Sequence, residues 1–376
     1  MSPPAEDSGP QGGALDNAGV LESSDRSGML GLIATVPDQV SDAWTRTRAL
    51  ELPASYPELR AVAVLGMGGS AIGGDLVAGI WSDRLRVPLV VVRGYELPAW
   101  VDSSTLVVAS SNSGNTEETL TALGAALARK APVAAITSGG ALATAAGRAS
   151  MPLLTLPAGG MPRAMVGYAV TLLAGLLERA GMLDLGDAEI RATVARGRSS
   201  VAAWGPDVPT ADNFAKQLAW SLVDRWPVIE ASGFLVPVAR RWKTQFNENA
   251  KSSAAWEELP EATHNTVVGY PNPEPVKDHL YVVFLASALD HARNRLRAAL
   301  SGAALDDAQI AHQQVTVEGE SRFEQAISAI VLGDFVTAYL AVLYGTDPTP
   351  IEVLTGIKEA LAAADLDVGP AAAKRT

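Results

Sequence analysis

The chain of 376 residues is long enough for two domains that each bury a core, and its formal net charge is −12 with a pI near 4.9. This acidity argues against nucleic acid or an anionic membrane as a partner, because proteins bind both of these polyanions mainly through clustered Lys and Arg. The sequence contains no cysteine, which excludes disulfides, thiol nucleophiles and cysteine-ligated metal centres. We expect no apolar run long enough to cross a bilayer and no secretory signal, and therefore a cytoplasmic protein.

The first 26 residues are rich in Pro, Gly, Ser and Asp. Such a composition buries too little apolar surface to offset the entropy of ordering, so we expect residues 1–26 to form a flexible acidic tail. Apolar residues at helical spacing between Met29 and Trp44 then predict helices that lead into a first domain. We expect this domain to span residues 27–190 and a second domain with C-terminal helices to span residues 191–376.

Strand and helix patterns alternate through the first half of the chain. Apolar runs predict strands at residues 61–65, 88–92, 105–110 and 132–137. Runs that are apolar on both faces are typical of central parallel strands, and the alternation predicts a doubly wound, mainly parallel sheet. Ligands of such sheets bind beyond the carboxyl ends of the strands. The fold class is therefore α/β.

The second half repeats this plan after a connection with scattered Gly and Pro at residues 183–209. It predicts strands at residues 227–232, 280–285 and 315–318, and helices at residues 214–224, 287–299, 323–344 and 352–363. A second mainly parallel sheet flanked by helices is expected.

The segment GMGGSAIGGD, residues 66–75, directly follows the first predicted strand. Glycines such as Gly69 let the backbone turn tightly and approach a ligand, Ser70 adds a hydroxyl, and the next helix presents unpaired N–H groups. The combination suits a sugar phosphate or a dinucleotide. A tight strand-to-helix connection without a ligand is the alternative.

The segment SSNSGNTEET, residues 110–119, follows another predicted strand and gathers several hydroxyls around one glycine. Ser111, Ser113 and Thr116 exceed what one helix cap requires, so we interpret the loop as a phosphate cradle, with an ordinary capped helix as the alternative. No Lys follows the glycines of either segment, which disfavours a Walker-type loop.

The segment FNENAKSSAAWEELPEATHN, residues 246–265, places polar groups in an apolar background. Proton transfer between adjacent carbons and opening of a sugar ring would need a carboxylate base and a second acid or base. Glu248 and His264 fit those two roles. A solvated helix that ends in a His cap is the alternative, and periodicity does not decide between them.

Together, the three segments closely resemble the bifunctional phosphoglucose/phosphomannose isomerase family, whose members contain two sugar-isomerase (SIS) domains. The resemblance covers roughly residue 30 to the C-terminus. It implies a metal-independent aldose-ketose isomerase that acts on a six-carbon sugar phosphate through a cis-enediolate, with SIS domains in both halves and phosphate binding in the first.

The resemblance also implies roles for individual residues. Gly69, Ser70, Ser111, Ser113 and Thr116 would bind the substrate phosphate. The catalytic residues would be Glu248 as the base between C1 and C2, His264 and Lys358 in ring opening, and Arg163 beside the enediolate. In this family the His reaches the neighbouring subunit's site, which implies a homodimer. Arg163 could instead pair with an acidic neighbour, and Lys358 could be a solvated residue of an amphipathic helix.

No cofactor and no metal are expected, because the four His residues are scattered singly rather than clustered. Two alternatives stay open. One is an SIS enzyme of another reaction, such as a ketose-phosphate aminotransferase module. It would leave the NEN segment (residues 247–249) and the HN segment (residues 264–265) unexplained. The other is a catalytically silent sugar-phosphate sensor, which would keep the Ser/Thr cradle and tolerate loss of Glu248.

Overall fold

The computed structural model describes residues 13–364, which form two compact units. Residues 38–191 group with residues 351–364 around one sheet, which we call the first-sheet unit. Residues 13–37 group with residues 192–350 around the other, the second-sheet unit. Segments 27–37 and 351–364 thus group differently from the domain boundaries expected from the sequence.

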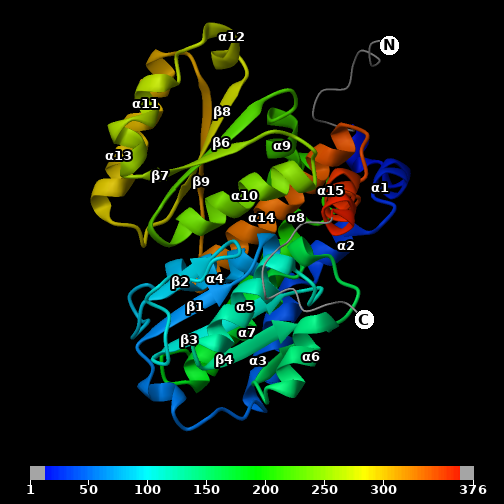
Figure 1. Ribbon diagram of the computed structural model, residues 1–376. Coiled ribbons are helices and arrows are strands. Elements are labelled where there is room, and N and C mark those ends of the chain that lie inside the picture. Colours follow the sequence, from blue (N-terminus) through cyan, green and yellow to red (C-terminus); the bar gives the residue numbers. More distant parts are fainter. Residues whose placement is uncertain (1–12, 365–376) are drawn as a thin grey trace. The chain divides into compact units, whose positions relative to one another are not determined.

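The first sheet is wholly parallel, with strand order β2-β1-β3-β4-β5. Its strands are β1 (Ala61–Leu65), β2 (Leu89–Val92), β3 (Thr105–Ser111), β4 (Val133–Thr137) and β5 (Leu153–Thr155). The four predicted strands are confirmed to within one residue. The short β5 was not predicted, because three residues are too few to set a pattern. Figure 1 shows β2, β1, β3 and β4 side by side in this order.

Helices cover both faces of the first sheet. The helices of this part of the chain are α3 (Val36–Arg48), α4 (Gly68–Ile80), α5 (Glu117–Ala128), α6 (Gly140–Arg148) and α7 (Val166–Arg179), and α15 (Glu352–Ala363) is grouped with the same unit. Gly74 of α4 lies directly on Val64, while Ala63 and Leu65 join the opposite core with α5 and α6. Alternate residues of β1 therefore face two different cores, which explains why its run is apolar throughout.

The second sheet is also parallel, with order β7-β6-β8-β9. Its strands are β6 (Trp226–Ser232), β7 (Ala255–Leu259), β8 (Leu280–Ala286) and β9 (Ala311–Thr316). The predicted strands 227–232 and 280–285 are confirmed. β7 was missed, and β9 begins four residues before the predicted strand at 315, because AWEEL and AHQQVT are too polar for an apolar pattern to mark them. The two sheets confirm the predicted α/β class.

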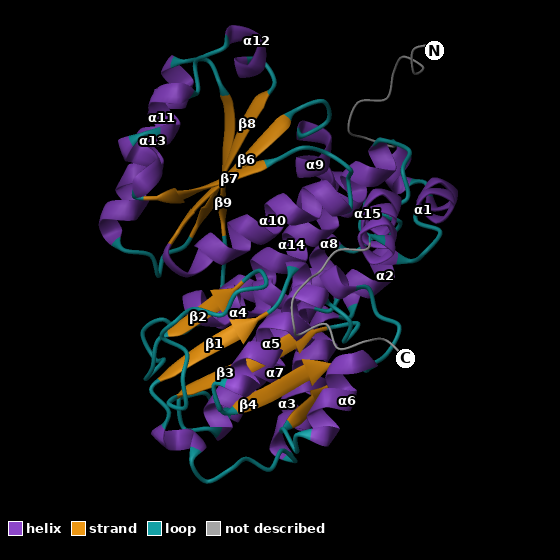
Figure 2. Cartoon of the chain, in the orientation of Figure 1, coloured by secondary structure: helices purple, strands orange, loops and turns teal. Residues whose placement is uncertain are grey.

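The helices of the second-sheet unit are α1 (Ala18–Ser24), α2 (Met29–Ala34), α9 (Phe214–Ser221), α10 (Val236–Glu248), α11 (Thr266–Gly269), α12 (Glu274–Lys277), α13 (Ala292–Asp307) and α14 (Arg322–Leu343), while α8 (Asp187–Trp204) begins before the unit boundary. Figure 2 shows the strands of this sheet between α13 on one side and α10 on the other. The predicted helix at 287–299 begins only at Ala292, because residues 287–291 form a loop and His291 caps the helix by accepting from the Arg293 N–H.

The expected flexible tail is wrong for residues 14–24, which form a short 3₁₀ helix and then α1. Leu15 is fully buried, and the carboxylate of Asp16 lies 3.1 Å from the Nζ atom of buried Lys216. Asn17 caps α1 by accepting from two backbone N–H groups. A few well-placed contacts thus order a segment of unfavourable composition. Residues 1–12 lie outside the described residues.

The expectation that no apolar run could cross a bilayer is also wrong by length and composition, because α14 meets both criteria. However, 94% of its most apolar window is buried inside the protein. α14 packs against α9, α10 and α2 of the same unit. It is a core helix, and such helices pass the same test of length and composition.

A buried polar ladder joins α10 to α14. The guanidinium of Arg241 forms a bidentate pair with the carboxylate of Asp334, with Nη2 2.9 Å from Oδ2, and Gln245 Nε2 donates to the same carboxylate at 2.9 Å. Arg241 is 2% exposed and Asp334 is fully buried. Close approach is possible because Gly333 lies against the ring of Trp242. The paired charges fix how the two helices pack.

We expect Asp334→Leu to lower the free energy of unfolding by about 3–5 kcal/mol, because it leaves the Arg241 guanidinium buried without its counter-ion. The double variant Arg241→Met/Asp334→Leu removes both charges and should recover most of this loss. Denaturant unfolding of the three proteins measures the difference. Equal losses in the single and double variants would contradict the role given to the charge pair.

Candidate functional site

The first glycine-rich loop lies at the carboxyl end of β1, where α4 begins at Gly68. A side chain at Gly69 would bring a Cβ atom within 2.8 Å of the Pro162 carbonyl oxygen, so glycine lets α4 approach the turn that carries Arg163. Ser70 Oγ accepts a hydrogen bond from the Asn112 N–H at 3.3 Å. Gly69 and Ser70 therefore connect this loop to two neighbouring segments.

The second loop follows β3, and its hydroxyls bond to one another and to N–H groups of the loop itself. Ser111 Oγ and Thr116 Oγ1 lie 2.8 Å apart, and the Gly114 N–H donates to Ser111 Oγ at 3.1 Å. Ser111 is buried, whereas Ser113 is exposed. Gly114 has φ of +69°, and a Cβ there would lie 1.8 Å from the Gly139 carbonyl oxygen. Glycine is therefore required at this position.

The loop after β4 supports the second loop. Ser138 Oγ donates to the Asn112 carbonyl at 2.6 Å, and Asn115 Oδ1 accepts from the Ala141 N–H at 3.0 Å. Asn112 Nδ2 reaches in another direction to the Gly160 carbonyl at 3.1 Å. Asn112 thus contacts the loops after β1, β4 and β5. Its place inside the motif SSNSGNTEET is the one sign of this role in the sequence.

The N-terminus of α5 lies directly after this loop. Thr116 occupies the N-cap position, but its side chain makes no capping hydrogen bond. The Thr116 hydroxyl is therefore not used for capping, and the first-turn N–H groups of α5 follow the exposed Ser113 within a few residues. An arrangement of open N–H groups, hydroxyls and a glycine turn suits a phosphate.

Arg163 lies in a short 3₁₀ turn, Pro162–Ala164, and is only 4% exposed. Gln39 braces this turn: its Nε2 donates to the Ala164 carbonyl at 2.7 Å and its Oε1 accepts from the Gly167 N–H at 3.1 Å. Because the same turn packs on Gly69, the first-sheet unit brings together Arg163 and the five predicted phosphate-binding residues. This makes one continuous candidate site in that unit.

Glu248 is the last residue of α10 in the second-sheet unit and is half-buried. Its neighbours are fixed on both sides. Asn249 is fully buried and donates through Nδ2 to Thr337 Oγ1 of α14 at 3.0 Å, while Asn247 Nδ2 donates to the Ser252 carbonyl at 2.9 Å. The two Asn residues of NEN therefore hold the turn, and the Glu between them stays at its surface.

Lys251 holds the same turn from outside. Its backbone has φ of +54°, and its Nζ atom donates to the carbonyls of Glu248 at 2.8 Å, Asp347 at 3.0 Å and Pro348 at 2.9 Å. A cation at this place complements the carbonyl groups and the negative end of α10. The local sequence gives no sign of these contacts, because Asp347 and Pro348 lie almost a hundred residues after Lys251.

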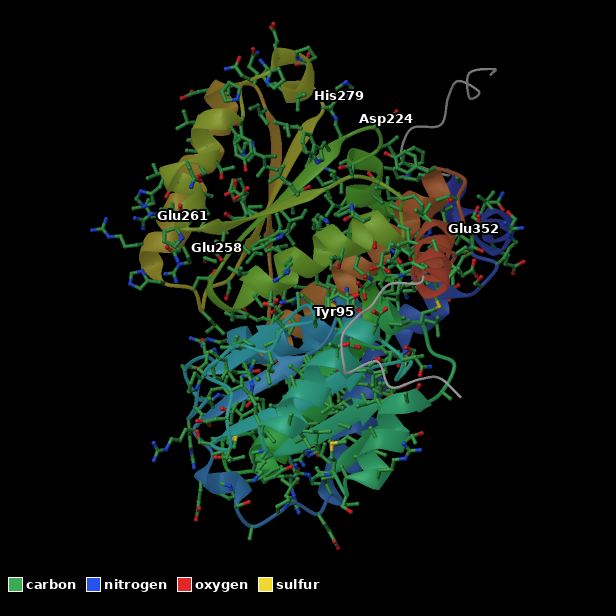
Figure 3. The ribbon with its side chains drawn as sticks, viewed as in Figure 1. Tyr95, Asp224, Glu258, Glu261, His279 and Glu352 are labelled. Carbon is green, nitrogen blue, oxygen red and sulfur yellow. The ribbon has the colours of Figure 1, made fainter. Side chains whose placement is uncertain are left out.

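His264 ends the 3₁₀ turn Glu261–His264 and is exposed. Asn265 fixes the turn: it donates to Glu261 Oε1 at 2.7 Å and its Oδ1 accepts from the Thr266 N–H at 2.6 Å. Figure 3 shows Glu258 and Glu261 close together at one side of the second-sheet unit. The imidazole of His264 is thus presented at the surface of its unit by a firmly held turn.

The remaining predicted residue, Lys358, is exposed on α15. Arg163 and the phosphate-binding residues lie in the first-sheet unit, as does Lys358, whereas Glu248 and His264 lie in the second-sheet unit. Within residues 13–364 there is no group of three or more His, Asp or Glu side chains that could hold a metal ion.

Two parallel sheets flanked by helices, with polar loops at their carboxyl ends, place the protein in the α/β class. Residues 211–361 match the family described as bacterial phospho-glucose isomerase C-terminal SIS domain. A solved structure of a glucose-6-phosphate isomerase like protein from Thermus thermophilus superposes with a TM-score of 0.60 at 22% identity, covering 90% of this chain and 99% of that one. This likeness shows the fold.

Two curated relatives are closer in sequence, and both are named bifunctional phosphoglucose/phosphomannose isomerase. The protein of Caldicellulosiruptor bescii is 36% identical over 331 residues, which cover 88% of this chain and 98% of the relative. That of Aquifex aeolicus is 33% identical over 80% of this chain and 90% of the relative. The chain belongs to the bifunctional phosphoglucose/phosphomannose isomerase family.

We expect Lys251→Met to loosen the NEN turn, because it removes a cation from several carbonyl groups, at a cost of about 1–2 kcal/mol in unfolding free energy. The Ser252 N–H, which donates to the Phe246 carbonyl at 3.1 Å, should exchange faster with solvent. Hydrogen exchange followed by mass spectrometry measures this, with Lys243→Met on α10 as the control. Unchanged exchange at residues 247–252 would contradict the role of Lys251.

Proposed function

We propose that the protein is a metal-independent aldose-ketose isomerase that interconverts glucose 6-phosphate and mannose 6-phosphate with fructose 6-phosphate. Membership of the family and the names of its relatives support this substrate class. The observation that carries the proposal is the loop after β3, where Ser113 is exposed and Thr116 makes no capping hydrogen bond at the start of α5. We also propose that the enzyme works in the cytoplasm, without a cofactor.

The phosphate anchors the substrate at the loops of the first-sheet unit. Ser70, Ser113 and the N-terminus of α5 donate hydrogen bonds to its oxygens, while Ser111 and Thr116 shape and complete the cradle. These donors bind a dianion without a cluster of basic residues, which fits a chain of net charge −12. Anchoring the phosphate reduces the entropy cost of placing C1 and C2 at the reacting groups.

Proton transfer at C1 and C2 is the chemical step. His264 and Lys358 assist opening of the ring, and the carboxylate of Glu248 removes the proton from C2 to form a cis-enediolate. The guanidinium of Arg163 stabilises the negative charge on the enediolate oxygens. Return of the proton from Glu248 to C1, together with transfer of the hydroxyl proton from O2 to O1, completes the ketose. No redox step and no metal are needed.

One intermediate explains two substrates. Glucose and mannose 6-phosphates differ only in configuration at C2, and that difference disappears in the enediolate. A base that can deliver the proton to either face of C2 therefore serves both. Thr349 is half-buried next to Pro348, which Lys251 contacts, and it precedes α15 in the chain. It is a candidate to shape the space around C2.

The protein is proposed to act as a homodimer in which His264 serves the neighbouring subunit's site. Its exposure supports this proposal, as does Val268 four residues later, which is 77% exposed. An exposed apolar residue beside an exposed imidazole favours a protein contact at this surface. No membrane and no nucleic acid are proposed as partners.

The first experiment follows the interconversion of fructose, glucose and mannose 6-phosphates by NMR with EDTA-treated protein. We expect conversion among all three, and Glu248→Gln should lower turnover by about 10²-fold or more, because an amide cannot accept the proton. Glu258→Gln, an exposed carboxylate on β7, is the control and should keep normal turnover.

Three other outcomes would each contradict one part of the proposal. Loss of activity in EDTA that zinc restores would refute the metal-independent mechanism. Binding without turnover in the unaltered protein would favour a silent sugar-phosphate sensor, and near-normal turnover by Glu248→Gln would remove Glu248 from the role of base.

Subunit mixing tests the contribution of His264 across the dimer. His264→Ala and Glu248→Gln should each be nearly inactive alone. After the two variants are unfolded and refolded together, half of the dimers carry one complete site, so roughly a quarter of normal activity should return. A mixture of Glu248→Gln with Arg163→Ala, two changes assigned to the same site, is the control. Mixtures without any recovery would place His264 in the site of its own subunit.

A further inference from the structure

A cavity with both polar and apolar lining residues lies entirely within the second-sheet unit, at the carboxyl ends of its strands. Its volume is about 290 Å³. It is lined by the ends of β6, β8 and β9, by Leu259 at the end of β7, by the loop 287–290 and by the first turns of α13. This size is at the small end of the range of ligand pockets, roughly 300–1,000 Å³, and matches one monosaccharide rather than a nucleotide.

Strand register explains how polar groups come to line this cavity. Glu230 of β6 pairs with Glu257 of β7 and with Phe284 of β8, and Phe284 pairs with Gln314 of β9. Residues in register on parallel strands share a face, and this face lies under α13, where Phe284 packs with Leu305. A row with three polar side chains therefore crosses this face, and Ser232 of β6 and Thr316 of β9, two positions further along their strands, add hydroxyls on the same face.

Glu230 is the most unusual member of the row, because it is only 1% exposed. The Tyr270 hydroxyl donates to its Oε1 at 2.5 Å, but its buried Oε2 has no hydrogen-bond partner within residues 13–364. Burial raises the pKa of the Glu230 carboxyl to about 7, and the nearby charge of Glu257 adds to this. An unsatisfied buried carboxyl oxygen is costly unless a ligand completes it.

The cavity corresponds in topology to the phosphate cradle of the first sheet. The order β2-β1-β3-β4 repeats as β7-β6-β8-β9, so the loop from β8 into α13 stands where the loop from β3 into α5 stands. The chemistry differs, because this second loop region presents Glu230 and Asp290 to the cavity. Two carboxyl groups would repel a phosphate.

The groups around the cavity offer both donors and acceptors. Asn294 and Gln314 contribute amides, Ser232 and Thr316 hydroxyls, and Phe284 an apolar surface. Arg295 also lines the cavity, but its Nη1 atom already donates to the carbonyls of Ala288 at 2.9 Å and Asp290 at 2.6 Å. A phosphate only accepts and an ammonium only donates, whereas a hydroxyl does both.

We propose that this cavity is a second binding site, for an uncharged polyhydroxylated ligand of monosaccharide size. A hydroxyl of the ligand donates to Glu230 Oε2, other hydroxyls meet Asn294 and Gln314, and a C–H face lies on Phe284. The site is separate from the phosphate cradle, and the inference does not rest on the proposed isomerase activity.

Calorimetric titration of the full chain with D-glucose tests the proposal, with ethylammonium and inorganic phosphate as the other two probes. We expect glucose to bind and both Glu230→Gln and Asn294→Leu to weaken its binding by about tenfold or more. Arg293→Leu, the exposed neighbour of Asn294 on α13, is the control and should bind glucose normally. Thermal unfolding checks that each variant is folded. If Asn294→Leu does not fold, Glu230→Gln still tests the proposal, because it keeps the shape of the side chain.

Loss of glucose binding in Ser113→Ala, with binding intact in Glu230→Gln, would place the sugar at the phosphate cradle and overturn the proposal. Failure of the unaltered protein to bind glucose would overturn it as well. Binding of ethylammonium or phosphate in this cavity, detected by its loss in Glu230→Gln, would overturn the ligand class.

Discussion

The bidentate pair between Arg241 and Asp334 is the constraint on which the second-sheet unit depends. A buried guanidinium and carboxylate tolerate only a narrow range of geometries, and Gln245 adds a further donor to the same carboxylate. One turn later, Asn249 bonds to Thr337, the residue three positions after Asp334. The ladder therefore fixes both the packing of α10 on α14 and the place where α10 ends, which is Glu248.

The two sheets repeat one topology but present different chemistry at their carboxyl ends. In the first, the rows that run into the loops are apolar, and polarity begins only at Ser110 and Ser111. In the second, polar side chains such as Glu230 and Gln314 stand within the strands themselves. Parallel sheets place the loops of neighbouring strands at one edge whatever their sequences. Duplication of the fold thus supplies two candidate sites that can diverge.

Much of this fold could be predicted because several strands, in both sheets, have an apolar local sequence that clearly indicates a buried strand. AVAVL in β1 and LYVVFLA in β8 are apolar almost without interruption, whereas β7 contains Glu257 and Glu258 and β9 contains two Gln residues. Those strands exist through pairing with β6 and β8, which is not a local property. For the same reason, composition could not tell that Leu15 and Asp16 would order the N-terminal segment, or that α14 is buried in protein rather than lipid.

The candidate site shows a similar division between local and distant causes. Gly69 and Gly114 could be recognised because only glycine, which has no side chain, permits so close an approach of two backbone segments. Glu248 and His264 needed the family resemblance, because a carboxylate or imidazole on a surface turn carries no periodic signal. Glu248, His264 and Ser113 are at least partly accessible, whereas supports such as Asn249 are buried. Around Glu248, stability therefore resides in supports such as Asn249, whereas Arg163 in the other unit is both buried and proposed for chemistry.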